Sequence, residues 1–99
     1  MRERDEDIIP DGITRNHILR AMEEFDQDGM PHGFKPSHTY DVVHEDRRYP
    51  PPAITALAIK QLIGTMPPPV IRAGKGTRCF AVLEECGFEI SHKKTMSSD

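Results

Sequence analysis

Residues 40–54 read YDVVHEDRRYPPPAI, and their pattern constrains the fold more than that of any other segment. Residues 39–43 are rich in β-branched and aromatic side chains, which favours a β-strand. Glu45 and Asp46 form the expected turn, although neither is the glycine that a tight two-residue turn usually contains. Residues 47–49 predict a short return strand, because the three prolines that follow cannot donate hydrogen bonds to a sheet. The stretch therefore predicts a β-hairpin that ends at a proline-rich boundary.

Helices are expected on both sides of this hairpin. A first helix is predicted from Thr14 to Phe25, because Thr14 is a good N-cap and Gly29 a good C-cap. A second is predicted over residues 52–63, since proline is tolerated in the first turn of a helix, and Gly64 ends it. Both segments carry apolar side chains at helical spacing. These are Ile18, Leu19, Met22 and Phe25 in the first helix, and Ile54, Leu57, Ala58 and Leu62 in the second.

A third helix and a last strand are expected near the C-terminus. The helix is predicted from Arg78 to Cys86, with Thr77 as its N-cap and Gly87 at its end. Residues 88–90 predict a short strand that joins the hairpin. The expected fold class is therefore α+β: an N-terminal helix, a β-hairpin, two further helices and a short C-terminal strand on a small antiparallel sheet.

The composition fits one small domain. The chain has 99 residues, of which 36% are hydrophobic, enough for a single modest core. Residues 11–91 are expected to form one α+β binding domain, with a flexible acidic tail over residues 1–10 and a flexible tail over residues 92–99. No apolar run approaches the roughly 18 residues of a membrane span, and the charged first residues lack a signal-peptide pattern. A cytoplasmic location without membrane contact is expected.

Charge is unevenly distributed along the chain. Residues 1–34 carry nine acidic and four basic side chains, whereas residues 35–99 carry seven acidic and nine basic ones. The net charge of -3 argues against a purely electrostatic nucleic-acid binder. The basic excess of the second part still permits a basic face on the folded domain.

The reactive residue types do not fall in patterns that predict catalysis. The five histidines and two cysteines lack the spacing of a zinc site. Cys79 lies within an apolar helical stripe, unlike an activated thiol. On one helix, Cys79 and Cys86 would be about 10 Å apart, too far for a disulfide. We therefore expect no enzyme activity, no metal and no cofactor.

A glycine-rich segment precedes the third predicted helix. Residues 74–77 read GKGT, which is similar to the end of a phosphate-binding loop but lacks its first glycine and its preceding strand. This argues against nucleotide hydrolysis. A looser interpretation is that the helix N-terminus, flanked by Lys75 and Arg78, binds a phosphate. The alternative, an ordinary glycine-rich entry into a helix, remains open.

Three segments together resemble a known family. Residues 40–54, 74–77 and 83–90 resemble, in order, the N-terminal head domain of ScoMcrA-like HNH endonucleases, restriction enzymes that attack modified DNA. The resemblance covers about residues 36–90. The matching residues are Tyr40, Val42, Asp46, Tyr49, Pro50, Pro51, Ile54, Thr77, Leu83, Gly87 and Phe88. The chain departs from the pattern at Arg47 in place of a turn glycine, at Pro52 in place of a lysine, and at Cys86 in place of a leucine.

The resemblance implies target recognition or docking in a DNA-related system. It implies no cleavage by this chain, because the HNH nuclease domain is not among these 99 residues. From the residues themselves, a basic patch would form if the hairpin and the start of the third helix lie on one side. The candidate nucleic-acid-binding residues are Arg47, Arg48, Tyr49, Lys75, Thr77 and Arg78. The arginine pair can equally be a solvated edge strand, and Tyr49 a core tyrosine.

Two functions follow from these observations. The first is a noncatalytic DNA-binding module whose partner is double-stranded DNA, which the family resemblance favours. The second is a protein-interaction or regulatory module that binds a nuclease or another protein without contacting nucleic acid. The acidic N-terminal part and the net charge of -3 favour the second function.

Overall fold

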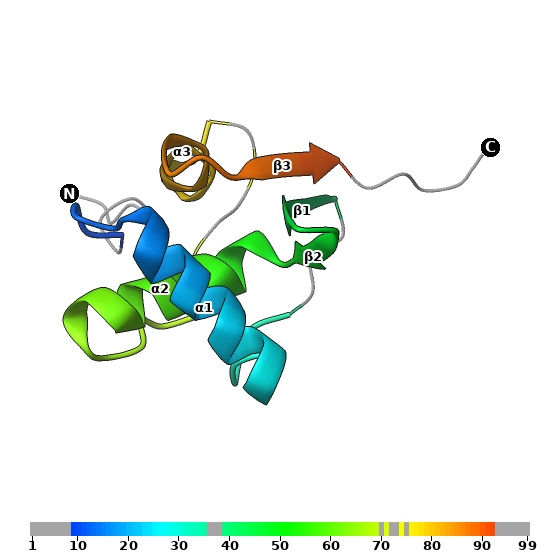
Figure 1. Cartoon of the computed structure of the whole chain (residues 1–99). Helices are drawn as coiled ribbons and strands as arrows, with labels where there is room; N and C mark the ends of the chain where they lie inside the picture. Colours follow the sequence, from blue (N-terminus) through cyan, green and yellow to red (C-terminus); the bar gives the residue numbers. More distant parts are fainter. Residues whose placement is uncertain (1–8, 36–38, 70, 72–73, 75, 93–99) are drawn as a thin grey trace.

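The structure, a computed structural model, describes residues 9–35, 39–69, 71, 74 and 76–92 (Figure 1). Their fold is α+β, as predicted. In chain order the elements are α1 (Arg15–Asp28), β1 (Tyr40–His44), β2 (Arg47–Tyr49), α2 (Pro51–Ile63), α3 (Arg78–Glu85) and β3 (Glu89–His92). Figure 1 shows α1 lying across α2, with the small sheet near one end of this helix pair.

The sheet has three antiparallel strands in the order β2-β1-β3. In the hairpin, Val42 lies opposite Tyr49 and His44 opposite Arg47. The two residues between the strands, Glu45 and Asp46, both have positive φ, at 51° and 69°. Positive φ at both central residues is the requirement of a type I′ turn, whose twist matches that of the strands. The predicted hairpin is therefore confirmed, with an acidic pair in the turn.

Helix α1 begins with a capping box that uses a histidine. The Thr14 hydroxyl accepts a hydrogen bond from the His17 backbone N–H at 3.4 Å, and His17 Nδ1 accepts one from the Thr14 N–H at 2.9 Å. Histidine here takes the place of the usual glutamate or glutamine. Gly29 ends the helix, as predicted, but the helix extends to Asp28, so the prediction that it stops at Phe25 was three residues short.

Helix α2 forms the centre of the core. Its residues from Ala53 to Ile59 are all buried, because α1, α3 and β1 contact it. The alanines in this run allow close approach of the neighbouring elements, and Ala56 and Ala58 join Ile18 of α1 and Leu83 of α3 in one apolar cluster. Pro51 starts the helix at a position where its missing N–H has no cost.

The end of α3 is closed onto α1. The Gly87 N–H donates to the Glu84 carbonyl at 2.9 Å and the Phe88 N–H to the Leu83 carbonyl at 3.0 Å, which is a Schellman motif. The Arg15 guanidinium lies 4.5 Å from the centre of the Phe88 ring and donates to the Cys86 carbonyl. These contacts fix the start of α1 against the turn that leads into β3.

Packed residues extend to both ends of the described range. Ile9 is buried in the core, so the packed region includes residues that precede residue 11. At the other end, β3 reaches His92. Within the described part of the chain, every helix is too short or too polar to cross a membrane.

Candidate nucleic-acid interface

The two arginines of β2 lie on opposite faces of the strand and each binds a carboxylate. Arg47 Nη1 is 2.8 Å from Asp26 Oδ1, on α1, and Arg48 Nη1 is 3.2 Å from Asp41 Oδ2, on β1. Arg48 pairs with Val43 across the ladder, so Asp41 is its diagonal neighbour. The arginine side chains remain 63% and 53% exposed. Both guanidiniums are thus held in place at the edge of the sheet while facing solvent.

Tyr49 shares the Asp26 carboxylate with Arg47. Its hydroxyl donates to Asp26 Oδ1 at 3.1 Å and is 3.2 Å from Oδ2. The ring is only 3% exposed and meets Phe25 edge to face, with 5.6 Å between ring centres. Burial, followed by the bond to Asp26, raises the pKa of Tyr49. A ring packed in this way cannot stack on a nucleic-acid base, so the tyrosine joins β2 to α1.

The residues at the start of α3 have other partners. The Thr77 hydroxyl donates to the Gly74 carbonyl at 2.6 Å and accepts from the Phe80 N–H at 3.4 Å. Arg78 Nε donates to the Ile9 carbonyl at 3.0 Å, and its Nη2 is 2.6 Å from Asp11 Oδ1. Lys75, the remaining candidate, lies outside the described residues. The described side chains at this helix entry therefore form a cap and hold the N-terminal segment.

The structure does not bring the two groups of arginines together. Arg47 binds Asp26 in the last turn of α1, whereas Arg78 binds Asp11, which precedes the start of that helix. At about 1.5 Å per residue, the helix from Arg15 to Asp26 alone spans roughly 16 Å. The candidate residues thus divide into a hairpin pair and a clamp near the start of α1.

Comparison with protein families now identifies the chain. The family described as ScoMcrA-like N-terminal head domain matches residues 11–92, a range that contains all six helices and strands of the described residues. This chain belongs to that family. The predicted resemblance to the head domain of ScoMcrA-like restriction enzymes is thereby confirmed. Comparisons with curated proteins and with solved structures gave no match.

The two thiols of this head domain are free, as their spacing predicts. Cys79 is buried, with its Sγ 3.1 Å from the Thr55 hydroxyl and 3.6 Å from the Pro51 carbonyl. Burial, partly offset by the bond to Thr55, raises the pKa of Cys79 to about 11. Burial and the nearby Glu85 raise the pKa of Cys86 as well. Both groups are therefore neutral thiols near pH 7, which are poor nucleophiles.

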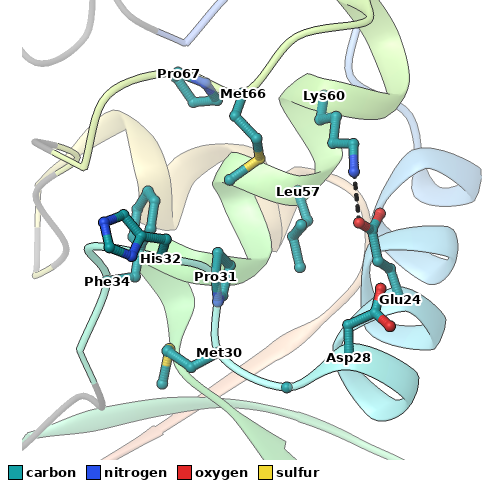
Figure 2. Close-up of a pocket in the computed structure, with 11 residues that line it drawn as sticks. Glu24, Asp28, Met30, Pro31, His32, Phe34, Leu57, Lys60, Met66 and Pro67 are labelled. Atoms are coloured by element: carbon teal, nitrogen blue, oxygen red, sulfur yellow. Dashed lines mark hydrogen bonds and ion pairs between the residues drawn. The ribbon is translucent and has the colours of Figure 1, made fainter.

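A cleft on another side of the head domain was not predicted from the sequence. It has a volume of about 310 Å³ and lies between α1, α2 and the loops that follow them (Figure 2). Two dipeptides of the same sequence, Met30-Pro31 after α1 and Met66-Pro67 after α2, line it from opposite sides, with Leu57 between them. The repeated Met-Pro pair after each helix is the sequence signal that could have indicated this site.

Proposed function

We propose that this head domain is a noncatalytic, cytoplasmic module that recognises double-stranded DNA through the β1–β2 hairpin. The observation that supports this proposal is the pair of exposed arginines on β2, each fixed by one carboxylate. A guanidinium has five N–H donors, so a contact between Nη1 and a carboxylate leaves donors that can reach a phosphate. Family membership adds the DNA-related context.

The proposal assigns no bond-breaking step to the chain. The Cys79 and Cys86 thiols are held in the neutral form, and the Thr77 hydroxyl is engaged in a helix cap. Neither kind of group is an activated nucleophile. Any cleavage in such a system would then belong to a partner that carries a nuclease site.

Binding through two arginines has a characteristic salt dependence. Each neutralised phosphate contributes a slope of about 0.9 to the plot of log affinity against log salt concentration. With two contacts the slope is about 1.8, so affinity should fall about tenfold between roughly 50 and 200 mM salt. Fluorescence anisotropy with a labelled duplex at these two salt concentrations measures the fall.

The test of the site is the double variant Arg47→Ala/Arg48→Ala. We expect it to lose about tenfold in affinity at low salt and most of the salt dependence. Arg20→Ala/Lys35→Ala removes the same charge from exposed residues outside the hairpin and is the matched control. Absence of duplex binding at low salt, or equal losses in the two double variants, would contradict the proposal.

A second candidate function, protein interaction without DNA contact, is favoured by the carboxylates around the hairpin. Asp26 and Asp41 each bind one of the arginines, and the turn itself presents Glu45 and Asp46. This acidic surrounding weakens attraction for phosphates. Size-exclusion chromatography of the purified protein, with and without duplex DNA at low salt, separates the two functions. Co-elution with the duplex that is lost at high salt and requires both arginines supports DNA binding. Elution of the protein apart from the duplex at low salt favours protein interaction.

A further inference from the structure

We propose that the cleft between α1, α2 and their following loops, here termed the Met-Pro cleft, binds a peptide segment of a partner protein. The segment carries a bulky apolar side chain next to a lysine or arginine. This inference goes beyond DNA recognition and does not depend on it, because the cleft is built from different residues than the hairpin surface.

The apolar part of the cleft is suited to a side chain of variable shape. Leu57 forms its floor, and the two Met-Pro pairs and Phe34 form its walls (Figure 2). Met66 remains 38% exposed, so apolar surface at the rim is in contact with water. Unbranched methionine side chains can adapt to different ligands, as at other promiscuous peptide-binding surfaces. Burying a leucine-like side chain here removes apolar surface from water on both partners.

The two loops that border the cleft contact each other. A Cβ atom built on Gly33 would lie 3.0 Å from Pro69 Cγ, so the loop after α1 touches the loop after α2. Gly33 also has a φ of +88°, a conformation that favours glycine. The prolines at residues 31 and 67 restrict both loops further. Binding therefore requires little ordering of the protein, which favours affinity.

The wall contributed by α1 supplies the charge preference. Glu24 is 2.6 Å from Lys60 Nζ, and this ion pair lies on one side of the cleft (Figure 2). Asp28 is the last residue of α1, where the helix dipole disfavours a negative charge, and no basic residue lies in that turn. No described residue pairs with Asp28. A carboxylate at such a position costs helix stability, and a cationic ligand group would offset this cost.

The dimensions and the charge of the cleft together select the occupant. About 310 Å³ accommodates one or two side chains. Because Lys60 neutralises Glu24, the net negative charge of this wall comes from Asp28, which repels the phosphates of a nucleic acid but attracts a guanidinium or an ammonium group. An apolar anchor beside a cation satisfies both the methionine walls and the acidic wall.

The experiment uses two acetylated, amidated peptides and ¹⁵N-labelled protein. The first peptide is Ser-Gly-Leu-Arg-Gly-Ser, and in the second, glutamate replaces the arginine. We expect the first to bind with a Kd of about 1 mM, as suits a contact of two side chains, and to shift the amides of Met30, His32 and Met66. The glutamate peptide should bind at least about fivefold more weakly.

Protein variants test the charged part and the apolar part of the cleft separately. Asp28→Asn should weaken binding of the arginine peptide about two- to fivefold, whereas Glu85→Gln, which removes the same charge from an exposed residue of α3, should not. Met66→Ser should weaken it about tenfold, because apolar contact is lost at an already exposed position. Duplex DNA binding should be unaffected by Met66→Ser, so failure here and failure of the hairpin proposal are distinguishable.

Three outcomes would overturn the inference. One is equal binding of the arginine and glutamate peptides, which removes the charge preference. Another is a set of amide shifts centred on the hairpin in place of the cleft. The third is binding of n-butylguanidine as tightly as the peptide, which would make the cleft a site for small cations and not for a peptide.

Discussion

The strand β2 and the start of α3 offer the same kind of residue in two different settings. In β2, Arg47 and Arg48 each hold a carboxylate from a neighbouring element and are more than half exposed. At the start of α3, Arg78 is 31% exposed and binds the Ile9 carbonyl in addition to Asp11. The hairpin arginines therefore retain exposed surface for a ligand, whereas Arg78 connects two distant parts of the chain.

This difference shows that an arginine's role depends on what its guanidinium already binds. The Asp26 carboxylate is 37% exposed, and an exposed ion pair contributes little free energy, so a phosphate can compete with Asp26 for Arg47. Arg48 binds the buried Asp41 but is itself more than half exposed, so it keeps N–H donors that face solvent. The Ile9 backbone carbonyl, which Arg78 binds, is a different kind of partner. Because Ile9 is buried, releasing Arg78 would disturb the packing of the N-terminal segment.

The largest effect is expected from Tyr49→Ala, because this tyrosine joins the hairpin to the core. The substitution removes a buried ring that packs on Phe25 and a hydroxyl that binds Asp26. Loss of a buried aromatic side chain costs about 3–5 kcal/mol in the free energy of unfolding. Urea denaturation followed by circular dichroism measures it.

Tyr49→Phe is the matched control for that prediction. It keeps the ring and removes only the hydroxyl, so we expect a loss of about 1 kcal/mol in unfolding free energy. Duplex affinity should stay unchanged, since the tyrosine is buried and the arginines remain. A large fall in duplex affinity with unchanged stability would instead make Tyr49 part of the contact surface. Tyr49 would then share the role assigned to Arg47 and Arg48.

Arg78→Ala is expected to have an intermediate effect, on stability alone. It removes the bond to the Ile9 carbonyl, and the pair with Asp11 adds little because Asp11 is almost fully exposed. A hydrogen bond from a charged donor is worth about 1.5–3 kcal/mol, and the partial exposure of Arg78 favours the lower figure. The unfolding free energy from urea titrations should therefore fall by about 1.5 kcal/mol.

The same variant distinguishes one basic patch from two separate regions. We expect Arg78→Ala to change duplex affinity no more than Arg20→Ala, which removes an equal charge from an exposed position on α1. If Arg78→Ala leaves stability intact and lowers duplex affinity as strongly as Arg47→Ala, then both regions contact DNA and the division between them is wrong.

Local features of this fold could be predicted from the sequence because they depend on neighbouring residues. The Thr14 and Thr77 caps, the hairpin turn and the glycine that follows α3 were all predicted in place. Each depends on hydrogen bonds or dihedral angles within a few residues. The end of α1 was misplaced because Asp-Gln-Asp is typical of a loop, whereas the helix continues to its capping glycine.

The candidate site was less predictable because its partners are distant in the chain. Tyr49 and Asp26 are 23 residues apart, and Arg78 and Ile9 are 69 apart. The separation of Arg78 from the hairpin follows from these contacts and not from any local pattern. The Met-Pro cleft likewise requires α1 and α2 to pack side by side before its two dipeptides meet.

The smallest effect is expected in the hairpin turn, from Glu45→Asn/Asp46→Gly. Both native residues adopt positive φ, which is unfavourable for L-residues and least so for asparagine and glycine. After the greater flexibility of glycine in the unfolded chain is subtracted, we expect a gain of about 0.5–1 kcal/mol in unfolding free energy. The double variant also removes two negative charges beside Arg47, so duplex affinity should rise severalfold at low salt.

Glu84→Gln/Glu85→Gln removes the same charge from exposed positions on α3 and is the control. If stability rises but duplex affinity rises no more than in this control, the DNA contact lies away from the turn. That result would favour the alternative in which β2 is an edge strand exposed only to solvent.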